Sequence, residues 1–214
     1  MIEALLPPGV TSSEAFDDAA PAPLFPAEAA LMKGRLARRR RQFATARACA
    51  RRCLAELGRP PAALLPGPGG APQWPRGVVG SITHCEGYRA AVAAPSSAMT
   101  ALGIDAEPAG PLPPGVLGLI TSAEERDHLA GLASADPSVP WDRLFFSAKE
   151  AAYKAWYPAT GIWLGFREAT LTLSPAGTFT TTLHPSVHPP VDPVYEGRWT
   201  TTPSLVLTLV SRTG

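Results

Sequence analysis

Proline divides this chain into short segments, and this division limits what the chain can fold into. Proline makes up 25 of the 214 residues, about 12%, whereas about 5% is usual. Proline lacks an amide donor and fixes φ, so it is excluded from helix interiors and central strands. The composition therefore excludes a coiled coil and favours short elements between loops. Because 45% of the residues are hydrophobic, these elements can share a packed core, and we expect an α+β chain.

Two proline-free segments carry signals for the start or the end of a helix. Residues 33–57 have apolar side chains at helical spacing, and Gly58 followed by Pro60-Pro61 is a typical helix end. Ser122, with a glutamate three positions later, predicts a capping box that opens another helix.

Short apolar runs bounded by proline and glycine predict strands. We expect them over residues 78–83, 88–94, 101–107, 171–173, 179–183, 198–202 and 205–210. A further helix is expected from about Trp141 to Trp156, ended by Pro158. Because the elements alternate similarly along the chain, we expect two similarly built halves, residues 33–107 and 108–214.

The net charge of +1 is unevenly distributed. Residues 1–32 are acidic and rich in proline and alanine, and we expect this segment to be loosely ordered around one short helix. Residues 33–59 contain ten basic residues and one acid, Glu56, a net charge of +9. Such a segment predicts an anionic partner. It is either a nucleic-acid patch, which no zinc-finger or RNA-binding signature supports, or a set of arginines that bind phosphate groups.

Three features favour a cytoplasmic protein that does not associate with a membrane. No run reaches the roughly 18 apolar residues that span a bilayer. The N-terminus lacks the basic start and apolar run of a secretory signal. The odd number of cysteines suits a reducing compartment, and we expect Cys49, Cys53 and Cys85 to be packing thiols.

Asp105 and Glu107 are two positions apart on an expected strand, so their carboxylates project from the same face. Adjacent carboxylates disfavour each other's ionisation, and a divalent cation such as Mg²⁺, which prefers oxygen ligands, relieves this conflict. A solvated surface pair is the alternative interpretation. Ile104 and its apolar neighbours favour a buried strand end, and therefore a site.

Glu150 and Lys154 share one face of the expected helix, with Lys149 on the adjacent row. The alternative is an exposed ion pair worth about 0.3–0.5 kcal/mol. Aromatic and alanine residues surround these positions and favour a packed helix. On such a helix Glu150 would complete a three-carboxylate Mg²⁺ site with Asp105 and Glu107, and the lysines would meet an anionic ligand.

Thr83 and His84 lie at the end of the first expected strand. Both side chains can donate hydrogen bonds to phosphate oxygens. A purely structural role for His84 is the alternative.

Three motifs, taken in order, resemble the signatures of the surfactin-type 4′-phosphopantetheinyl transferases. They are Gly80-Ser81-Ile82-Thr83-His84-Cys85, Gly103-Ile104-Asp105-Ala106-Glu107, and Phe146-Ser147-Ala148-Lys149-Glu150-Ala151-Ala152-Tyr153-Lys154. Within this family the chain is particularly similar to the actinobacterial carrier-protein transferases and to the enterobactin-synthase component. The resemblance covers about residues 33–210 and includes Pro72-Gln73-Trp74-Pro75 and Trp163-Leu164-Gly165-Phe166.

The resemblance implies a fold, a reaction and a set of site residues. The fold is a monomeric pseudo-dimer of two similar α/β halves with the active site in the cleft between them. The reaction moves 4′-phosphopantetheine from coenzyme A to a serine of an apo acyl or peptidyl carrier protein, giving holo carrier protein and 3′,5′-ADP. It uses Mg²⁺, for which Mn²⁺ can substitute.

The implied roles follow the motifs residue by residue. Asp105, Glu107 and Glu150 match the Mg²⁺ ligands, and Glu150, Lys154 and His84 match catalytic residues, with Glu150 as the base and Lys154 on the pyrophosphate. The implied coenzyme A contacts are Arg39, Arg47, Gly67, Gly69, Thr83, His84, Asp105, Lys149, Glu150 and Lys154.

One departure from the family pattern concerns the loop before Pro72. Pro66 and Gly69 stand where many relatives carry a basic residue for the 3′-phosphate, so coenzyme A either binds more weakly or depends on the arginine-rich helix. Two other functions remain as alternatives. They are a Mg²⁺-dependent phosphohydrolase acting on a nucleotide or coenzyme A, and a nucleic-acid-binding module.

Overall fold

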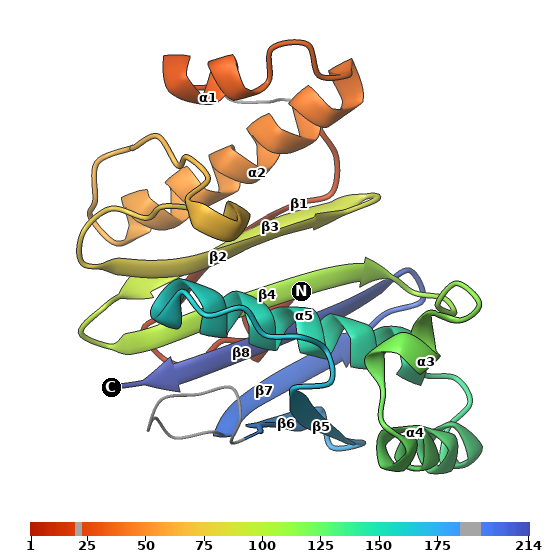
Figure 1. The fold of residues 1–214 in the computed structure, drawn as a ribbon. Helices are drawn as coiled ribbons and strands as arrows, with labels where there is room; N and C mark the ends of the chain where they lie inside the picture. The colour runs from red at the N-terminus through yellow and green to blue at the C-terminus, as the bar shows by residue number, and fades with distance from the viewer. Residues whose placement is uncertain (20–22, 185–193) are drawn as a thin grey trace.

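Two antiparallel sheets form the centre of the protein, and each carries one long helix (Figure 1). The computed structural model describes residues 1–19, 23–184 and 194–214. This architecture confirms the expected α+β class.

The first sheet has three strands in the order β1–β3–β2. Its strands are β1 (Thr11–Ala15), β2 (Val78–Cys85) and β3 (Tyr88–Pro95). Helix α2 (Ala37–Glu56) packs on β3 and β1 through the fully buried Cys49, Cys53 and Leu54. It ends where the sequence predicts, because Gly58 adopts the left-handed conformation at φ 66°.

The second sheet has five strands in the order β4–β8–β7–β6–β5. They are β4 (Met99–Pro108), β5 (Ala169–Ser174), β6 (Thr178–Leu183), β7 (Val194–Thr201) and β8 (Leu205–Thr213). Helix α5 (Trp141–Thr160) crosses β4 and β8, and its buried face, which includes Phe145 and Trp156, forms the main core with this sheet.

Two shorter helices precede α5: α3 (Val116–Ile120) and α4 (Ala123–Ala135). The expected capping box is present at the start of α4. The Ser122 hydroxyl accepts from the Glu125 amide at 3.2 Å, and the Glu125 carboxylate accepts from the Ser122 amide at 2.8 Å.

The two sheets meet where β2 lies against β4, and serine and threonine side chains join them. Ser81 Oγ accepts from the Ile104 amide at 3.0 Å, and Thr83 Oγ1 accepts from the Ala106 amide at 3.1 Å. The ends of β2 and β4 that carry the predicted site residues are therefore held side by side.

Gly103 allows α5 to lie directly on β4. A Cβ atom at this position would lie 2.0 Å from the Ala151 carbonyl oxygen and 2.6 Å from the Ala155 amide nitrogen, so only glycine fits. This close approach places Glu150 and Lys154, on the same stretch of α5, over the end of β4.

The N-terminal segment is more ordered than its composition predicts. The helical turn η1 (Ile2–Leu5) packs into the core, and β1 pairs with β3 along its whole length. Helix α1 (Pro26–Leu31) lies over α2 (Figure 1). The acidity of this segment is partly structural, since the fully buried Glu28 accepts from the Leu64 amide and from Arg51, both at 3.0 Å.

One further expectation differs from the structure. Helix α5 does not stop at Pro158 but continues to Thr160, because a proline in the last turn removes only one amide donor and Gly161 forms the actual end at φ 69°. The boundary expected after residue 107 stays a prediction; strand β4, which precedes it, pairs with β8, which follows it.

Candidate active site

Asp105 and Glu107 project from β4 toward α5, as their spacing predicts. Asp105 is only 5% exposed. Its Oδ1 lies 2.6 Å from Lys154 Nζ, and its Oδ2 accepts from Ser147 Oγ at 2.9 Å. Glu107 is half-buried and pairs with Arg143, with 2.9 Å between Oε2 and Nη1. Both carboxylates are thus held by cationic or hydroxyl groups of α5.

Lys154 forms its ion pair with Asp105 across the gap between helix and strand. Within the described residues it is not paired with Glu150, its neighbour one turn away on the same helix. The interpretation of Glu150 and Lys154 as a simple surface ion pair is therefore wrong. The helix therefore presents a carboxylate and an ammonium group, which are not paired with each other, to the same cavity.

The carboxylates of this region repel one another. Burial raises the pKa of Glu150, and the charges of Asp105 and Glu107 raise it further, while Lys154 opposes the shift. Burial and Asp105 likewise raise the pKa of Glu107 against the opposing charge of Arg143. Negative charge therefore accumulates here beyond what the two cations balance.

The predicted metal ligands lie near one another without forming a ready-made ligand set. Across residues 1–19, 23–184 and 194–214, no group of three or more His, Cys, Asp or Glu side chains is placed so that it could hold a metal ion. Lys154 and Arg143 take up carboxylate oxygens of Asp105 and Glu107 instead.

Arginines of α2 line a cavity of about 340 Å³. Arg39 and Arg47 face it together with His84 and Pro66. Arg39 donates to Nε2 of His84. Burial lowers the pKa of His84 to about 4, with further contributions from Arg39 and Lys154, so the imidazole is neutral near pH 7.

Arg47 is largely buried and already has structural partners. Its Nε donates to the Leu64 carbonyl at 2.8 Å, and its guanidinium lies 4.3 Å from the centre of the Phe43 ring. Burial lowers the pKa of Arg47 to about 10, and Glu28 opposes the shift, so the side chain stays charged near pH 7. Arg47 therefore both tethers the loop after α2 and lines the cavity.

Three other expected contacts are placed differently. The Thr83 hydroxyl lies 3.4 Å from Asp105 Oδ1, so it belongs with the carboxylates rather than with the arginine-lined cavity. Gly69 lines a second cavity of about 180 Å³. The Gly67 amide is used within the loop, where it donates to the Ala71 carbonyl at 2.8 Å.

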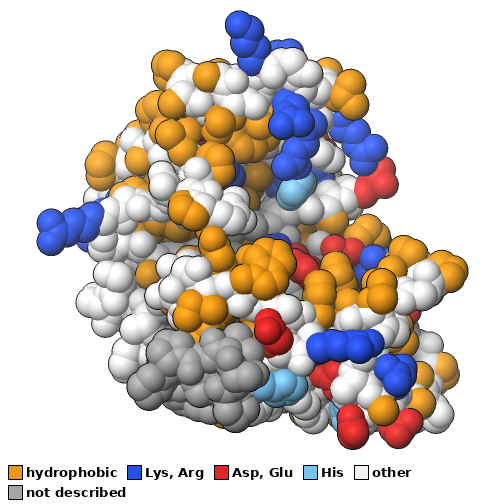
Figure 2. Space-filling model, in the orientation of Figure 1, with side chains coloured by type: hydrophobic (Ala, Val, Ile, Leu, Met, Phe, Trp, Pro, Cys, Tyr) orange, Lys and Arg blue, Asp and Glu red, His pale blue; other side chains and the backbone are white. Residues whose placement is uncertain are grey.

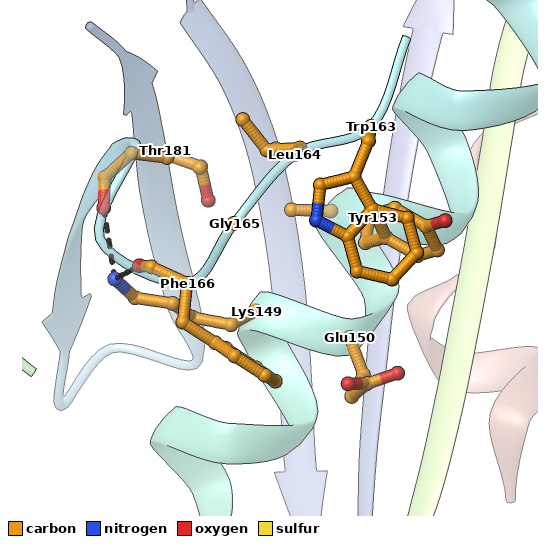
Figure 3. A pocket seen from close by; sticks show the side chains of 10 residues that line it. Lys149, Glu150, Tyr153, Trp163, Leu164, Gly165, Phe166 and Thr181 are labelled. Carbon is orange, nitrogen blue, oxygen red and sulfur yellow. Dashed lines mark hydrogen bonds between the residues drawn. The ribbon is translucent and has the colours of Figure 1, made fainter. Parts of the chain in front are cut away.

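Lys149 points away from the carboxylates. Its ammonium donates to the carbonyls of Phe166 and Ala169, at 2.5 and 2.8 Å (Figure 3). It also lies 3.0 Å from Glu125 Oε1. Lys149 also lines a third cavity, of about 180 Å³. Its ammonium thus holds the segment before β5 against α5.

The third cavity opens beside Glu150 and is mainly apolar. Tyr153, Trp163, Leu164 and Phe166 form its walls, and Thr181 lies at the end away from Glu150 (Figure 3). The hydroxyls of Tyr153 and Thr181 are buried and have no hydrogen-bond partner among the residues that the structure describes.

The three cavities adjoin one another, because neighbouring cavities share lining residues. Gly70, Pro72 and Ile82 line both the first and the second cavity, and Glu150 and Tyr153 line both the second and the third. Figure 2 shows basic side chains gathered above the hollow and acidic side chains within it. The cavities adjoin in this order, from an arginine-lined one, past Glu150 and Lys154, to a mainly apolar one, and we refer to the three together as the cleft.

Sequence reasoning missed several residues that build this site. Ser147 lies within a recognised motif, but nothing singled out its hydroxyl. Glu125 was expected only as part of the capping box, Arg143 gave no signal beyond its charge, and Thr208 gave none.

Comparisons with known proteins agree with this geometry. One family model, the 4′-phosphopantetheinyl transferase N-terminal domain, matches residues 27–94, and the 4′-phosphopantetheinyl transferase superfamily model matches residues 101–202. The division between the two models falls just before β4, where the second sheet begins.

Characterised actinobacterial proteins match most of the chain. The 4′-phosphopantetheinyl transferase Svp of Streptomyces mobaraensis is 51% identical over 99% of this chain and 89% of its own length. Npt of Nocardia iowensis is 51% identical over 80% of this chain and 76% of its own. PptT of Mycobacterium tuberculosis is 44% identical over 86% and 84%, respectively. This chain therefore belongs to the 4′-phosphopantetheinyl transferase family.

Membership in this family defines the activity. The protein is an enzyme that transfers the phosphopantetheine group of coenzyme A to carrier proteins, and metal dependence is typical of its family. No helix in the described ranges is long and apolar enough to cross a membrane.

Proposed function

We propose that coenzyme A binds along the whole cleft and that Glu150 and Lys154 transfer its phosphopantetheine group to a serine of an apo acyl or peptidyl carrier protein, releasing 3′,5′-ADP. The observation that carries this proposal is the order of the three cavities. An arginine-rich cavity, a lysine–carboxylate centre and an apolar cavity follow one another as the 3′-phosphate nucleotide, the pyrophosphate and the pantetheine arm do in coenzyme A.

The arginine-lined cavity suits the nucleotide end. Arg39 and Arg47 provide fixed positive charge for the 3′-phosphate, and arginine binds phosphate bidentately. The neutral His84 accepts from Arg39 through Nε2, which leaves its Nδ1–H free to donate to a phosphate oxygen. Pro66 and Gly70 bring no charge, so the arginines and His84 carry this contact.

The apolar cavity suits the pantetheine arm, which alternates methylene groups with amides. Tyr153, Trp163 and Phe166 provide apolar surface, and the hydroxyls of Tyr153 and Thr181, which no described residue bonds, offer hydrogen bonds to amides. We propose that Lys149 contributes to this wall through its methylene chain rather than through its charge.

We propose that Asp105, Glu107 and Glu150 would hold a Mg²⁺ ion beside the pyrophosphate position, where Lys154 and Arg143 pair with the first two carboxylates in this structure. Three carboxylates share this region with only two cations, and carboxylate oxygens are the ligands that Mg²⁺ prefers, with Mn²⁺ as a substitute. When bound, the ion would neutralise charge on the pyrophosphate.

The chain's own residues supply the rest of the chemistry. Lys154 places an ammonium beside the carboxylates, where it can bind a pyrophosphate oxygen and stabilise the charge that develops in transfer. The Glu150 carboxylate lines the cavity that also contains Lys154, where it can accept the proton of the carrier serine, directly or through a water molecule. The leaving group is a phosphate anion and needs little protonation.

The same steady-state assay tests both the base and the metal. Glu150→Gln keeps the size of the side chain and removes its charge, so kcat should fall far more than KM for coenzyme A rises. EDTA should abolish turnover, and Mg²⁺ or Mn²⁺ should restore it. Wild-type kcat for Glu150→Gln would overturn the assignment of the base, and full activity in EDTA would overturn the metal site.

Every residue of this proposed site comes from one chain, and we propose a cytoplasmic monomer. The free thiols of Cys49, Cys53 and Cys85 support a reducing compartment. Light scattering of the purified protein tests the oligomeric state, and a dimer would contradict it.

A further inference from the structure

A chain of buried hydroxyl groups holds the Asp105 carboxylate from behind. Ser147 Oγ donates to Asp105 Oδ2 at 2.9 Å, and the same oxygen lies 2.9 Å from Thr208 Oγ1. Thr208 is the cross-strand partner of Asp105 in the β4–β8 pair. Ser147 and Thr208 are fully buried, so no solvent competes for these bonds.

Thr208 Oγ1 has a single proton and two acceptors within reach. It donates to the Ser147 carbonyl at 3.0 Å and lies 2.9 Å from Ser147 Oγ. Ser147 donates its own proton to Asp105 Oδ2. Thr208 therefore contacts both the backbone and the hydroxyl of Ser147 and holds the group that donates to the carboxylate in place.

The two carboxylate oxygens of Asp105 consequently have different surroundings. Oδ2 is held inside the protein by Ser147, whereas Oδ1 lies next to Lys154, whose side chain lines the cleft. Without the Ser147 hydroxyl, the carboxylate would be held only through Oδ1, by Lys154 at 2.6 Å and by the Thr83 hydroxyl at 3.4 Å, among the described residues.

We propose that Ser147, supported by Thr208, is a positioning residue that orients one oxygen of Asp105 toward the bound divalent cation. This inference rests on the proposed metal site and adds to it two residues that do not touch the ion. Groups that hydrogen-bond to a metal ligand typically change metal affinity about 10- to 100-fold when they are removed.

The test compares two variants with a matched control, using Mn²⁺ as the probe. Ser147→Ala and Thr208→Val each remove one hydroxyl of the chain. Thr121→Val removes a fully buried threonine hydroxyl that donates to the Leu117 carbonyl and contacts none of the cleft carboxylates. Mn²⁺ affinity of the full-length protein is measured by electron paramagnetic resonance, and thermal unfolding verifies that each variant is folded.

We expect Ser147→Ala to weaken Mn²⁺ binding about 10- to 100-fold, Thr208→Val to weaken it less, and Thr121→Val to leave it unchanged. In turnover assays the half-saturating Mg²⁺ concentration should rise for Ser147→Ala, and saturating Mg²⁺ should restore kcat. If Ser147 had a merely structural role, Ser147→Ala would lower kcat at every Mg²⁺ concentration and leave the half-saturating Mg²⁺ concentration unchanged.

The outcomes separate this inference from the proposed metal site. If the wild-type protein fails to bind Mn²⁺, the proposed metal site is wrong, and the positioning role of Ser147 is overturned as well. If the wild type binds Mn²⁺ and both hydroxyl variants bind it equally well, only the positioning role is overturned. Should Ser147→Ala not fold, Thr208→Val decides by the same criterion.

Discussion

The Lys149 ammonium lies 3.0 Å from Glu125 Oε1 and donates its other protons to two backbone carbonyls, so none remains for a phosphate. Glu125 is equally occupied, because the same Oε1 accepts from the Leu171 amide at 2.8 Å. This buried ion pair joins α5, α4 and the start of β5, and it holds the wall of the apolar cavity in place.

Lys149→Met should therefore destabilise the fold. Breaking a buried ion pair typically costs about 3–5 kcal/mol, which corresponds to a fall in Tm on the order of 10 °C for a chain of this size. The double variant Lys149→Met/Glu125→Gln removes both charges and should recover part of this loss. Thermal unfolding of the two variants tests the role of Lys149, and an unchanged Tm for Lys149→Met would refute it.

Gly103→Ala should separate α5 from β4. The added Cβ would lie 2.0 Å from the Ala151 carbonyl oxygen, and overpacking of this kind costs about 1–3 kcal/mol or more. Because Glu150 and Lys154 lie on the displaced part of α5, kcat should fall as well as Tm. Gly131→Ala is the control, since a Cβ at that exposed position of α4 meets nothing within 4 Å. Equal behaviour of the two variants would contradict the close approach.

The contribution of Arg47 to the 3′-phosphate can be isolated with 3′-dephospho-coenzyme A. A charge-assisted hydrogen bond is worth about 1.5–3 kcal/mol, so Arg47→Ala should raise KM for coenzyme A about 10- to 100-fold. It should affect 3′-dephospho-coenzyme A far less, because that molecule lacks the phosphate.

The ratio of kcat/KM for the two co-substrates is the quantity to measure. It removes general effects of losing the bond from Arg47 to the Leu64 carbonyl, which both co-substrates share. Arg41→Ala, an exposed arginine on the same helix, is the matched control. An unchanged ratio in Arg47→Ala would mean that this arginine serves only the fold or the carrier protein.

Stability in acid should depend on Glu14. Burial by itself would raise the pKa of this carboxyl, but hydrogen bonds from the chain's amino group, Tyr88 and the Ile2 amide outweigh it, and the pKa is lowered. A lowered pKa in the folded state stabilises the fold above about pH 4.5, and this stability is lost as the pH falls through the lowered value. Glu14→Gln should therefore lose stability at neutral pH and show a flatter decline in acid. Glu3→Gln, at an exposed position, should follow the wild-type curve in denaturant titrations from pH 3 to 7.

Most of the fold could be predicted because proline and glycine mark the ends of its elements. Strand β1 was missed, since all five of its residues are only half-buried and show no apolar alternation. The end of α5 was placed too early, because Pro158 sits in a last turn that tolerates a missing amide. The order within the sheets required the structure, since strand pairing depends on contacts far apart in the sequence.

The carboxylates and Lys154 could be predicted because spacing determines which side chains share a face. Spacing alone does not predict which residues of other elements each face contacts. Lys149 sits one residue from Glu150 but faces Glu125, and Ser147 meets Thr208 across 61 positions of sequence. Such partners become apparent only once α5 lies on β4 and β8.

The central claim is that this cleft transfers phosphopantetheine to a carrier protein, and mass spectrometry tests it most directly. The purified enzyme is incubated with Mg²⁺, coenzyme A and each member of a panel of apo carrier proteins. We predict that at least one carrier gains a single phosphopantetheine on its serine while 3′,5′-ADP appears in equal amount, and that Glu150→Gln slows both. Consumption of coenzyme A at the same rate with and without carrier protein, and no carrier modified, would contradict the account and indicate a phosphohydrolase instead.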